Sequence, residues 1–315
     1  LLQALRDRSD AFARIEVVAF ERVVLHHLTY RSTMTAAPPA PRDPKKPRRS
    51  TFFYVRVSVL LLILFVVVLY AVRDVWSRRA RNEWTRTLDV AVVLVHVESS
   101  DAIDPEAIQS LKERAAVLEA RLTSETARLR WSHPDVKAPF RLRVFGPIEV
   151  HAPPPTPASD SPVDLAKQTV NMKTWLAGVD PSAGVIPEHW DTRVYVSIQR
   201  PRSQDRSFVE GASEQDGRVG AVAVELAPDM VDLTLFVVAH ELMHTLGATD
   251  KYDVSGRAVV PAGLVEPNRQ PLYPQAFAEV MARNRPISPS AEAVPQTLDE
   301  LGIGEVTARE IGWLR

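Results

Sequence analysis

The chain has 315 residues, of which 45% are hydrophobic and 24% are charged, and its formal net charge is −1 at pH 7. This apolar fraction suffices for a packed core, and the length allows one large domain or two small ones. The near-neutral charge gives no sign of a nucleic-acid partner, and we expect none. The absence of cysteine excludes disulfides and thiolate metal sites, so any metal must be held by His, Asp or Glu.

The N-terminal segment, residues 1–51, is expected to lie in the cytoplasm. The first methionine of the chain is Met34. Residues 1–33 either form an amphipathic helix or are translated upstream sequence, with the natural start at Met34, and we favour the second alternative. From Met34 onward a polar lead rich in Pro and Ala is followed by a basic cluster at 42–49 and then by a long apolar run.

Residues 52–72, FFYVRVSVLLLILFVVVLYAV, form this apolar run with one early charge, Arg56. About 20 apolar residues suffice for a helix to cross the hydrocarbon core, and Arg56 lies near enough to the end to extend towards the headgroups. A buried core helix is a weak alternative, because the run is apolar on every side. A cleaved signal peptide is the stronger one, but no small-x-small cleavage site follows. We therefore predict an uncleaved transmembrane anchor at residues 52–72.

The orientation of this anchor follows from the basic residues on its two sides. Five precede it within 42–49, and four follow it: Arg73, Arg78, Arg79 and Arg81. The side with more Lys and Arg tends to stay in the cytoplasm. We therefore expect a single-pass protein of the cell membrane whose C-terminal domain is extracytoplasmic, either periplasmic or extracellular, with residues 73–86 as a juxtamembrane linker. The basic cluster is expected to attract anionic lipid.

Residues 87–315 alternate strand-like and helix-like segments, which predicts one α/β domain with a twisted mixed sheet backed by helices. Valine-rich or alternating segments predict strands, and apolar residues at helical spacing predict helices. The expected strands are 87–97, 141–150, 192–199 and 219–226, and the expected helices are 105–130 and 164–176. The proline-rich segment 151–162 and the polar segment 201–218 are expected to be loops.

Residues 231–253, VDLTLFVVAHELMHTLGATDKYD, combine a mostly apolar helix with two histidines. Residues four apart share a helical face, so His240 and His244 can bind one small cation. Glu241 lies beside that face and can reach a metal-bound water without being a ligand. The alternative is two surface histidines on an ordinary helix. The apolar context argues against it, because burying two histidines and a glutamate without a purpose is costly.

A glycine and an aspartate follow this helix. Gly247 permits a backbone turn with positive φ, after which the chain can double back and present Asp250 as a third ligand. Three protein ligands with an open fourth position are typical of a catalytic zinc site and not of a closed structural one. We therefore predict that Zn²⁺ is the cofactor and that His240, His244 and Asp250 bind it.

The segment HELMHTLGATDKYD resembles the zinc-binding signature of the metzincin metallopeptidases, His-Glu-x-x-His-x-x-Gly-x-x-His/Asp. Its third ligand, an aspartate, is similar to the snapalysin-like variants rather than to the majority with a third histidine. The resemblance implies a Met-turn beneath the metal, for which Met281 in AEVMARNRP is the candidate. It also implies a closing C-terminal helix, expected within 297–314.

In layout the resemblance covers residues 87–315, but in specific residues it covers only 240–253. It implies that an edge strand pairs with extended substrate, and residues 219–226 or their neighbour are the candidate. Residues 87–315 would then be a zinc metallopeptidase domain that acts on a protein or peptide substrate near the membrane.

The implied mechanism is zinc-assisted hydrolysis of the peptide bond. Zinc would polarise the scissile carbonyl and lower the pKa of a bound water towards about 7. Glu241 would take the proton of that water and pass it to the leaving amine. Tyr252 and Tyr273 are weaker candidates, for which a packing or surface role is favoured. Glu279 is expected to form hydrogen bonds in the Met-turn and is assigned no chemistry.

Two other functions stay open. The first is a zinc hydrolase that acts on a non-protein amide such as peptidoglycan. The second is a membrane-anchored binding protein whose metal site is catalytically vestigial, although the intact Glu241 argues against it. Oligomeric state and substrate identity are not indicated by any pattern in the sequence.

Overall fold

The structure is a computed structural model that describes residues 51–98, 100–131, 133, 135–156, 161–201, 209–213 and 217–314. The expectations for the start at Met34 and for the basic cluster at 42–49 lie outside the described residues. The chain divides into two units between Leu61 and Leu62, and the second unit contains the sheet and the histidine-bearing helix.

Helix α2, Thr51–Arg81, contains the apolar run. Its window Phe52–Leu69 has a mean hydropathy of 2.8, and none of the window is buried. By length and composition this helix could cross a membrane; its insertion and its orientation stay predictions. The helix extends past residue 72 through most of the segment that was expected to be a linker.

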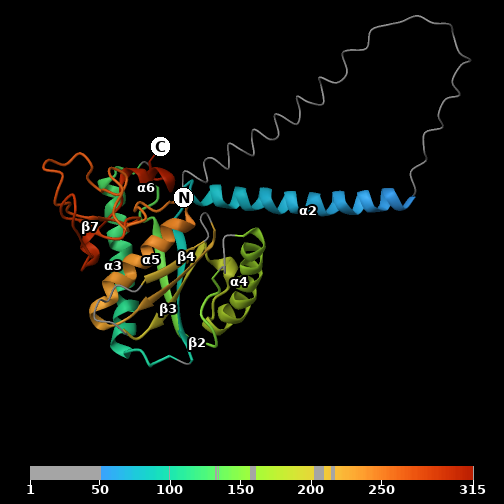
Figure 1. The fold of residues 1–315 in the computed structure, drawn as a ribbon, viewed down its shortest axis with the longest axis horizontal. Helices are drawn as coiled ribbons and strands as arrows, with labels where there is room; N and C mark the ends of the chain where they lie inside the picture. Colours follow the sequence, from blue (N-terminus) through green and yellow to red (C-terminus); the bar gives the residue numbers. More distant parts are fainter. Residues whose placement is uncertain are drawn as a thin grey trace, which may run out of the picture. The chain divides into compact units, whose positions relative to one another are not determined.

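A five-stranded sheet forms the centre of the second unit (Figure 1). In chain order its strands are β1 Leu88–Val97, β2 Phe140–Val150, β3 Thr192–Gln199, β4 Val209–Ser213 and β5 Val219–Glu225. Their order in the sheet is β2-β1-β3-β5-β4. All neighbours run parallel except β4 and β5, which are antiparallel. The four parallel strands are the four that the sequence predicts.

Helices cover both faces of this sheet, so the fold is of the mixed α/β class. Helices α3, Pro105–Arg128, and α5, Val231–Thr245, lie on one face, and α4, Pro162–Ala183, lies on the other (Figure 1). Alternate side chains of β1 enter the two cores: Val90 and Val92 pack on the side of α3 and α5, and Val93 packs on the side of α4. A strand buried on both faces needs no polar alternation, which explains its valine-rich sequence.

The polar segment 201–218 contains a strand that the sequence does not reveal. β4 pairs with β5 from Val209 opposite Val224 to Ser213 opposite Gly220. Gly, Ala, Ser and Glu within β4 are poor strand formers, so its pairing with β5 and not its own propensity makes it a strand. The expectation of a loop is therefore wrong for 209–213. β5 is an interior strand, and its neighbour β4 forms the edge.

Helix α4 is longer than the predicted 164–176. The Ser161 hydroxyl accepts a hydrogen bond from Asp164 N at 3.2 Å, which caps the first turn. Gly184 adopts a φ of 68° just after the last turn. A serine cap at the start and a left-handed glycine after the end are a common pair of helix boundaries, and here they enclose one helix from Pro162 to Ala183.

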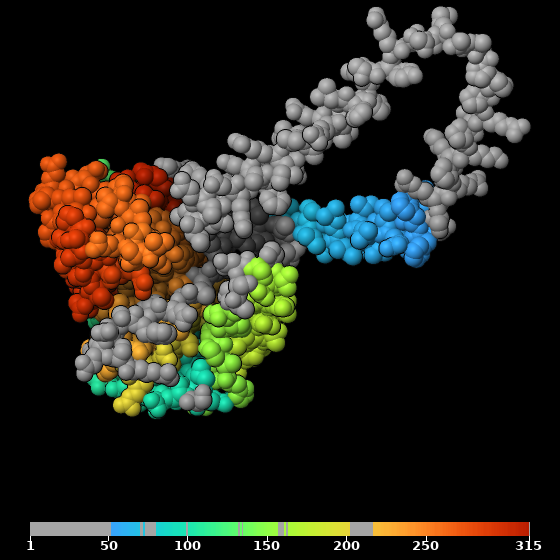
Figure 2. All heavy atoms as spheres, viewed as in Figure 1, coloured from blue at the N-terminus to red at the C-terminus, as the bar shows by residue number. Residues whose placement is uncertain are grey.

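The chain after α5 forms short elements, and a C-terminal helix lies within residues 297–314, as expected. This helix, α6, spans Glu305–Glu310. An added Cβ at Gly302 would lie 2.8 Å from a Val265 side-chain carbon, so only glycine fits there without a shift. Leu301 and Gly302 pair with Ala278 and Glu279, so the backbone before α6 is extended. The strands of this region are β6 Ala278–Glu279, β7 Arg285–Pro286, β8 Glu292–Ala293 and β9 Leu301–Gly302. Figure 2 shows these orange-to-red segments gathered in one part of the domain.

The residues at the end of α2 belong to the packed domain. Arg81 is buried, and its guanidinium donates hydrogen bonds to Gly217 O at 3.0 Å and to the Thr192 hydroxyl at 3.2 Å. The Asn82 amide donates to Leu246 O at 2.8 Å, directly after α5. Domain packing therefore begins at Arg81, ahead of the boundary expected at residue 87.

Trp84 is the largest side chain in this junction and is 1% exposed. Its indole Nε1 donates to Ile311 O at 2.8 Å, next to the C-terminus. Its ring contacts Trp131, Phe140 and Trp313 edge-on, with centroids 5.4–5.8 Å apart. Trp84 therefore joins the start of the domain to its end.

Replacing Trp84 with alanine should lower the free energy of unfolding by about 3–5 kcal/mol, because it leaves a large cavity in an aromatic cluster. Denaturant unfolding of the full chain in detergent, followed by fluorescence, measures this loss. Trp84→Phe keeps most of the ring and removes one hydrogen bond, so its loss should be smaller. Wild-type stability of Trp84→Ala would show that residues before β1 contribute little to the fold.

Candidate metal centre

Helix α5 is held in the core along most of its circumference. Val238, Ala239, Leu242 and Met243 are all fully buried. His240 and His244 lie one turn apart on the remaining side, with side chains 15% and 17% exposed. The apolar sequence around the histidines therefore fixes the helix and leaves one narrow polar face, as the sequence predicts.

The turn that ends α5 places the chain for a third polar group. Gly247 N bonds to His244 O at 3.0 Å, and Ala248 N bonds back to Met243 O at 3.1 Å. Gly247 has a φ of 98°, so this is a helix end of the Schellman type with glycine in the position that side chains resist. The reversal brings Asp250 back over the histidine face.

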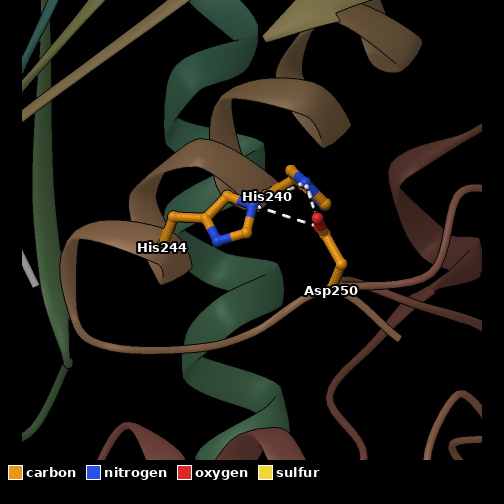
Figure 3. Close-up of side chains that lie close together, drawn as sticks. All are labelled: His240, His244 and Asp250. Carbon is orange, nitrogen blue, oxygen red and sulfur yellow. Dashed lines mark hydrogen bonds and ion pairs between the residues drawn. The ribbon is translucent and has the colours of Figure 1, made fainter. Parts of the chain in front are cut away.

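Asp250 and the two histidines point towards one another (Figure 3). The two Nε2 atoms are 3.1 Å apart. Asp250 Oδ1 lies 3.4 Å from Nε2 of His240 and 3.2 Å from Nε2 of His244. Ligands at about 2.0–2.1 Å from a tetrahedral zinc ion are separated by roughly 3.3 Å. The three atoms therefore have the spacing of three corners of such a site.

Backbone carbonyls orient both imidazole rings. His240 Nδ1 donates to Val280 O and His244 Nδ1 donates to Ala248 O, each at 2.9 Å. A carbonyl oxygen can only accept, so both Nδ1 atoms carry a proton and the neutral rings present the Nε2 lone pair to the cluster. This outer hydrogen bond is the usual support for a metal-ligating histidine. The donor set and its supports therefore fit a metal ion.

The charges of the cluster reinforce one another. Burial raises the pKa of Asp250, but His240 and His244, which donate from Nε2 when their rings are protonated, outweigh burial and hold that pKa well below its usual range. Burial likewise lowers the pKa of His244, but Asp250 and Glu241 raise it by more, so the net shift is upward. Asp250 therefore stays ionised, and a metal ion that bound here would replace the proton between its carboxylate and the His244 ring.

Glu241 is 3% exposed and lies next to the histidine face on α5. An added Cβ at Gly220 of β5 would lie 3.5 Å from Glu241 Cβ, so the helix and the sheet are close at this position. Burial and the charges of Asp250 and Glu241 raise the pKa of Tyr252. The Glu241 carboxylate is therefore near enough to act electrostatically on His244 of the cluster and on Tyr252 beside it.

The candidate Met-turn is joined to the cluster by backbone hydrogen bonds. Met281 is fully buried in the main core. The preceding carbonyl, Val280 O, accepts from the His240 ring, and Met281 O accepts from Lys251 N at 2.8 Å. The turn therefore bonds to a histidine of the cluster and to the residue that follows Asp250.

A buried ion pair holds the loop that carries Asp250. Lys251 is 4% exposed, and its ammonium contacts both Glu310 carboxylate oxygens at 2.7 and 2.9 Å and the Thr249 carbonyl at 2.7 Å. Glu310 also accepts from Thr249 N at 3.0 Å. The sequence does not reveal the pairing of Lys251 with Glu310, because no local pattern pairs residues that are 59 positions apart.

The two tyrosines have different positions. The Tyr252 ring stacks against His240 with centroids 6.5 Å apart, and the Arg283 guanidinium lies 5.8 Å from the centre of the same ring. Tyr252 therefore flanks the cluster. Tyr273 lines a separate cavity of about 50 Å³ beside Glu292. Within the described part of the chain, only His240, His244 and Asp250 form a group that could hold a metal ion.

Replacing Gly247 with alanine should destabilise the protein by about 1–2 kcal/mol, since a Cβ is unfavourable at positive φ. The same change should weaken metal binding, because the positions of Ala248 O and Asp250 both depend on this turn. Thermal unfolding and metal content measure the two effects. Gly178→Ala is the matched control, since an added Cβ on that helical glycine meets nothing within 4 Å. Equal behaviour of the two variants would show that the turn does not set the site.

Comparisons with known proteins add little to this description. No family model matches the chain, and no curated protein matches it. Among solved structures, the chain is similar to archaemetzincin from Methanopyrus kandleri, with 17% identity and a TM-score of 0.29 over 55% of this chain and 79% of that chain. A TM-score this low does not establish a shared fold or a shared function.

Proposed function

We propose that the chain is a membrane-anchored, zinc-dependent endopeptidase. The observation that carries the proposal is the cluster of His240, His244 and Asp250, with both rings oriented through Nδ1 and with Glu241 buried beside them. Two nitrogens and one carboxylate oxygen are the donor set of a catalytic zinc site with an open position. The side chain of Asp250 is 43% exposed, which supports access from solvent on that side.

The proposed chemistry adds water across a peptide bond. When bound, zinc would polarise the scissile carbonyl and acidify a water molecule. The Glu241 carboxylate accepts a proton from the attacking water as the new C–O bond forms. It then gives that proton to the nitrogen of the leaving amine as the C–N bond breaks. The hydroxyl group thus ends on the carbonyl carbon and the proton on the amine.

The proposed substrate is an extended polypeptide. β4 forms an edge of the described sheet, and a free edge can pair with an extended peptide through backbone hydrogen bonds. β5, the neighbour of β4, lies close to Glu241 at Gly220. These positions support a peptide that binds along β4 and has its scissile bond near the cluster.

Glu241→Gln should keep zinc and lose hydrolysis of a casein substrate by about 100-fold or more, the usual contribution of a general base. His244→Ala should lose the metal as well. Zinc content and casein cleavage, each with and without chelator, separate the two results. Glu113→Gln, on the exposed side of α3, is the control and should behave as wild type.

Full activity in Glu241→Gln would refute this mechanism. Zinc-dependent cleavage of a cell-wall amide but not of casein would favour a hydrolase with a non-protein substrate. Bound zinc without cleavage of either substrate would favour a binding protein.

The full chain should sediment with membranes and resist extraction at alkaline pH, because the proposed anchor, residues 52–72, contains the apolar window Phe52–Leu69. A variant that begins at Ala80 keeps Arg81 and Trp84 and should be soluble and folded. Protease access to the C-terminal domain from the outer side of intact cells tests the orientation. A full chain that is soluble without detergent would refute the anchor.

A further inference from the structure

Glu279 is a fully buried carboxylate that the proposed chemistry does not use. It is 0% exposed, and its two oxygens accept separate backbone hydrogen bonds. Met281 N donates to Oε2 at 2.6 Å, and Gly304 N donates to Oε1 at 3.1 Å. Burying an acid is costly unless its polar atoms are hydrogen-bonded, and these two bonds offset that cost at Glu279.

The turn that Glu279 closes touches both halves of the metal site. Val280 O accepts from His240 Nδ1 at 2.9 Å, and Met281 O accepts from Lys251 N at 2.8 Å. Val280 N bonds to Gly302 O at 2.9 Å, which ties the turn to β9. His240 lies on helix α5, and Asp250 lies in the loop after that helix. The turn is therefore a common support for ligands from two segments.

We propose that Glu279 is a positioning residue of the metal site: by fixing Met281 N and Gly304 N, it holds the Val280 carbonyl against the His240 ring and the Met281 carbonyl against the Asp250 loop. This inference rests on the proposed zinc site, and it assigns to Glu279 a share of the affinity for that metal. Glu279 does not contact the metal or the substrate.

A carboxylate suits this role better than an amide. Two N–H groups approach two different oxygens of Glu279, and only an ionised carboxyl group offers two acceptors. A glutamine would turn an NH₂ group towards one of the two donors, so one hydrogen bond would be lost. Burial raises the pKa of Glu279 overall, although the Thr307 hydroxyl, the two N–H donors and the charge of Lys251 act in the opposite direction.

Glu125 provides a matched control within the same region. It is 1% exposed and accepts a hydrogen bond from Ile303 N at 2.8 Å, one residue before the Gly304 amide that Glu279 binds. Its charge is paired with Arg121 and Arg128 at 3.0 and 2.6 Å. Glu125 therefore stabilises the same segment from the side of α3, but it does not hold the Met-turn.

The test compares zinc affinity in the full chain, purified in detergent, by competition with a chromophoric chelator. Loss of an outer-shell partner commonly weakens metal binding by about 10–100-fold. We expect Glu279→Gln to raise the Kd for zinc by about 10-fold, the lower end of that range, because Glu279 acts through a backbone carbonyl. Glu125→Gln should leave the Kd within about twofold of wild type by the same reasoning, although both variants should lower the Tm.

Each outcome decides the role of Glu279. Wild-type affinity in folded Glu279→Gln, or an equal loss in Glu125→Gln, overturns the inference in favour of general packing. If Glu279→Gln does not fold, Glu279→Asp replaces it, since the shorter carboxylate keeps the charge but cannot reach both N–H groups; wild-type affinity in that variant also overturns the inference. Absence of zinc binding by the unsubstituted chain refutes the proposed function itself and is seen before any variant is compared.

Discussion

Two hydrogen bonds, from the Nδ1 atoms of His240 and His244 to backbone carbonyls, are the constraint on which the site depends. They fix the protonated nitrogen of each ring and turn the other nitrogen towards Asp250. One of the two carbonyls, Ala248 O, belongs to the turn that ends α5, so it follows directly from the local sequence. The other, Val280 O, comes from a segment 40 residues further along the chain. The site therefore requires the C-terminal part of the fold.

That C-terminal part contains few regular elements, and buried polar groups hold it in place. Glu279 and Lys251 are both almost wholly inaccessible, and each is satisfied by backbone or by an opposite charge. Breaking one partner of such a buried group costs more than the intact contact contributes, because the remaining group stays desolvated. The loops around the cluster are therefore held in one arrangement by these buried polar contacts. Elsewhere in the domain, helices and strands have that role.

The sequence predicts those features that depend on neighbouring residues. The four parallel strands follow from their valine-rich segments, and the approach of His240 to His244 follows from helical spacing. The return of Asp250 follows from Gly247, whose positive φ permits the reversal. Each of these signals lies within about ten residues, the range over which periodicity and turn chemistry act.

Features that depend on distant partners were not predictable in this way. β4 is a strand because β5 lies beside it, although its own composition favours a loop. Gly302 leaves room for the Val265 side chain, a contact that no local pattern reveals. Lys251 finds Glu310 only in the folded chain. The group of His240, His244 and Asp250 was therefore accessible from sequence, whereas the residues that hold these three in place required the structure.

The junction at Arg81 and Asn82 limits where the chain can be cut between the proposed anchor and the domain. Asn82 bonds to Leu246 O at the end of the histidine-bearing helix, and Arg81 is anchored at Thr192 and Gly217. A proteolytic cut after these residues removes part of the domain together with the apolar helix. Release of an intact domain from the proposed anchor therefore requires a cleavage before Arg81, within the last turns of α2, where the backbone is helical and must first unwind.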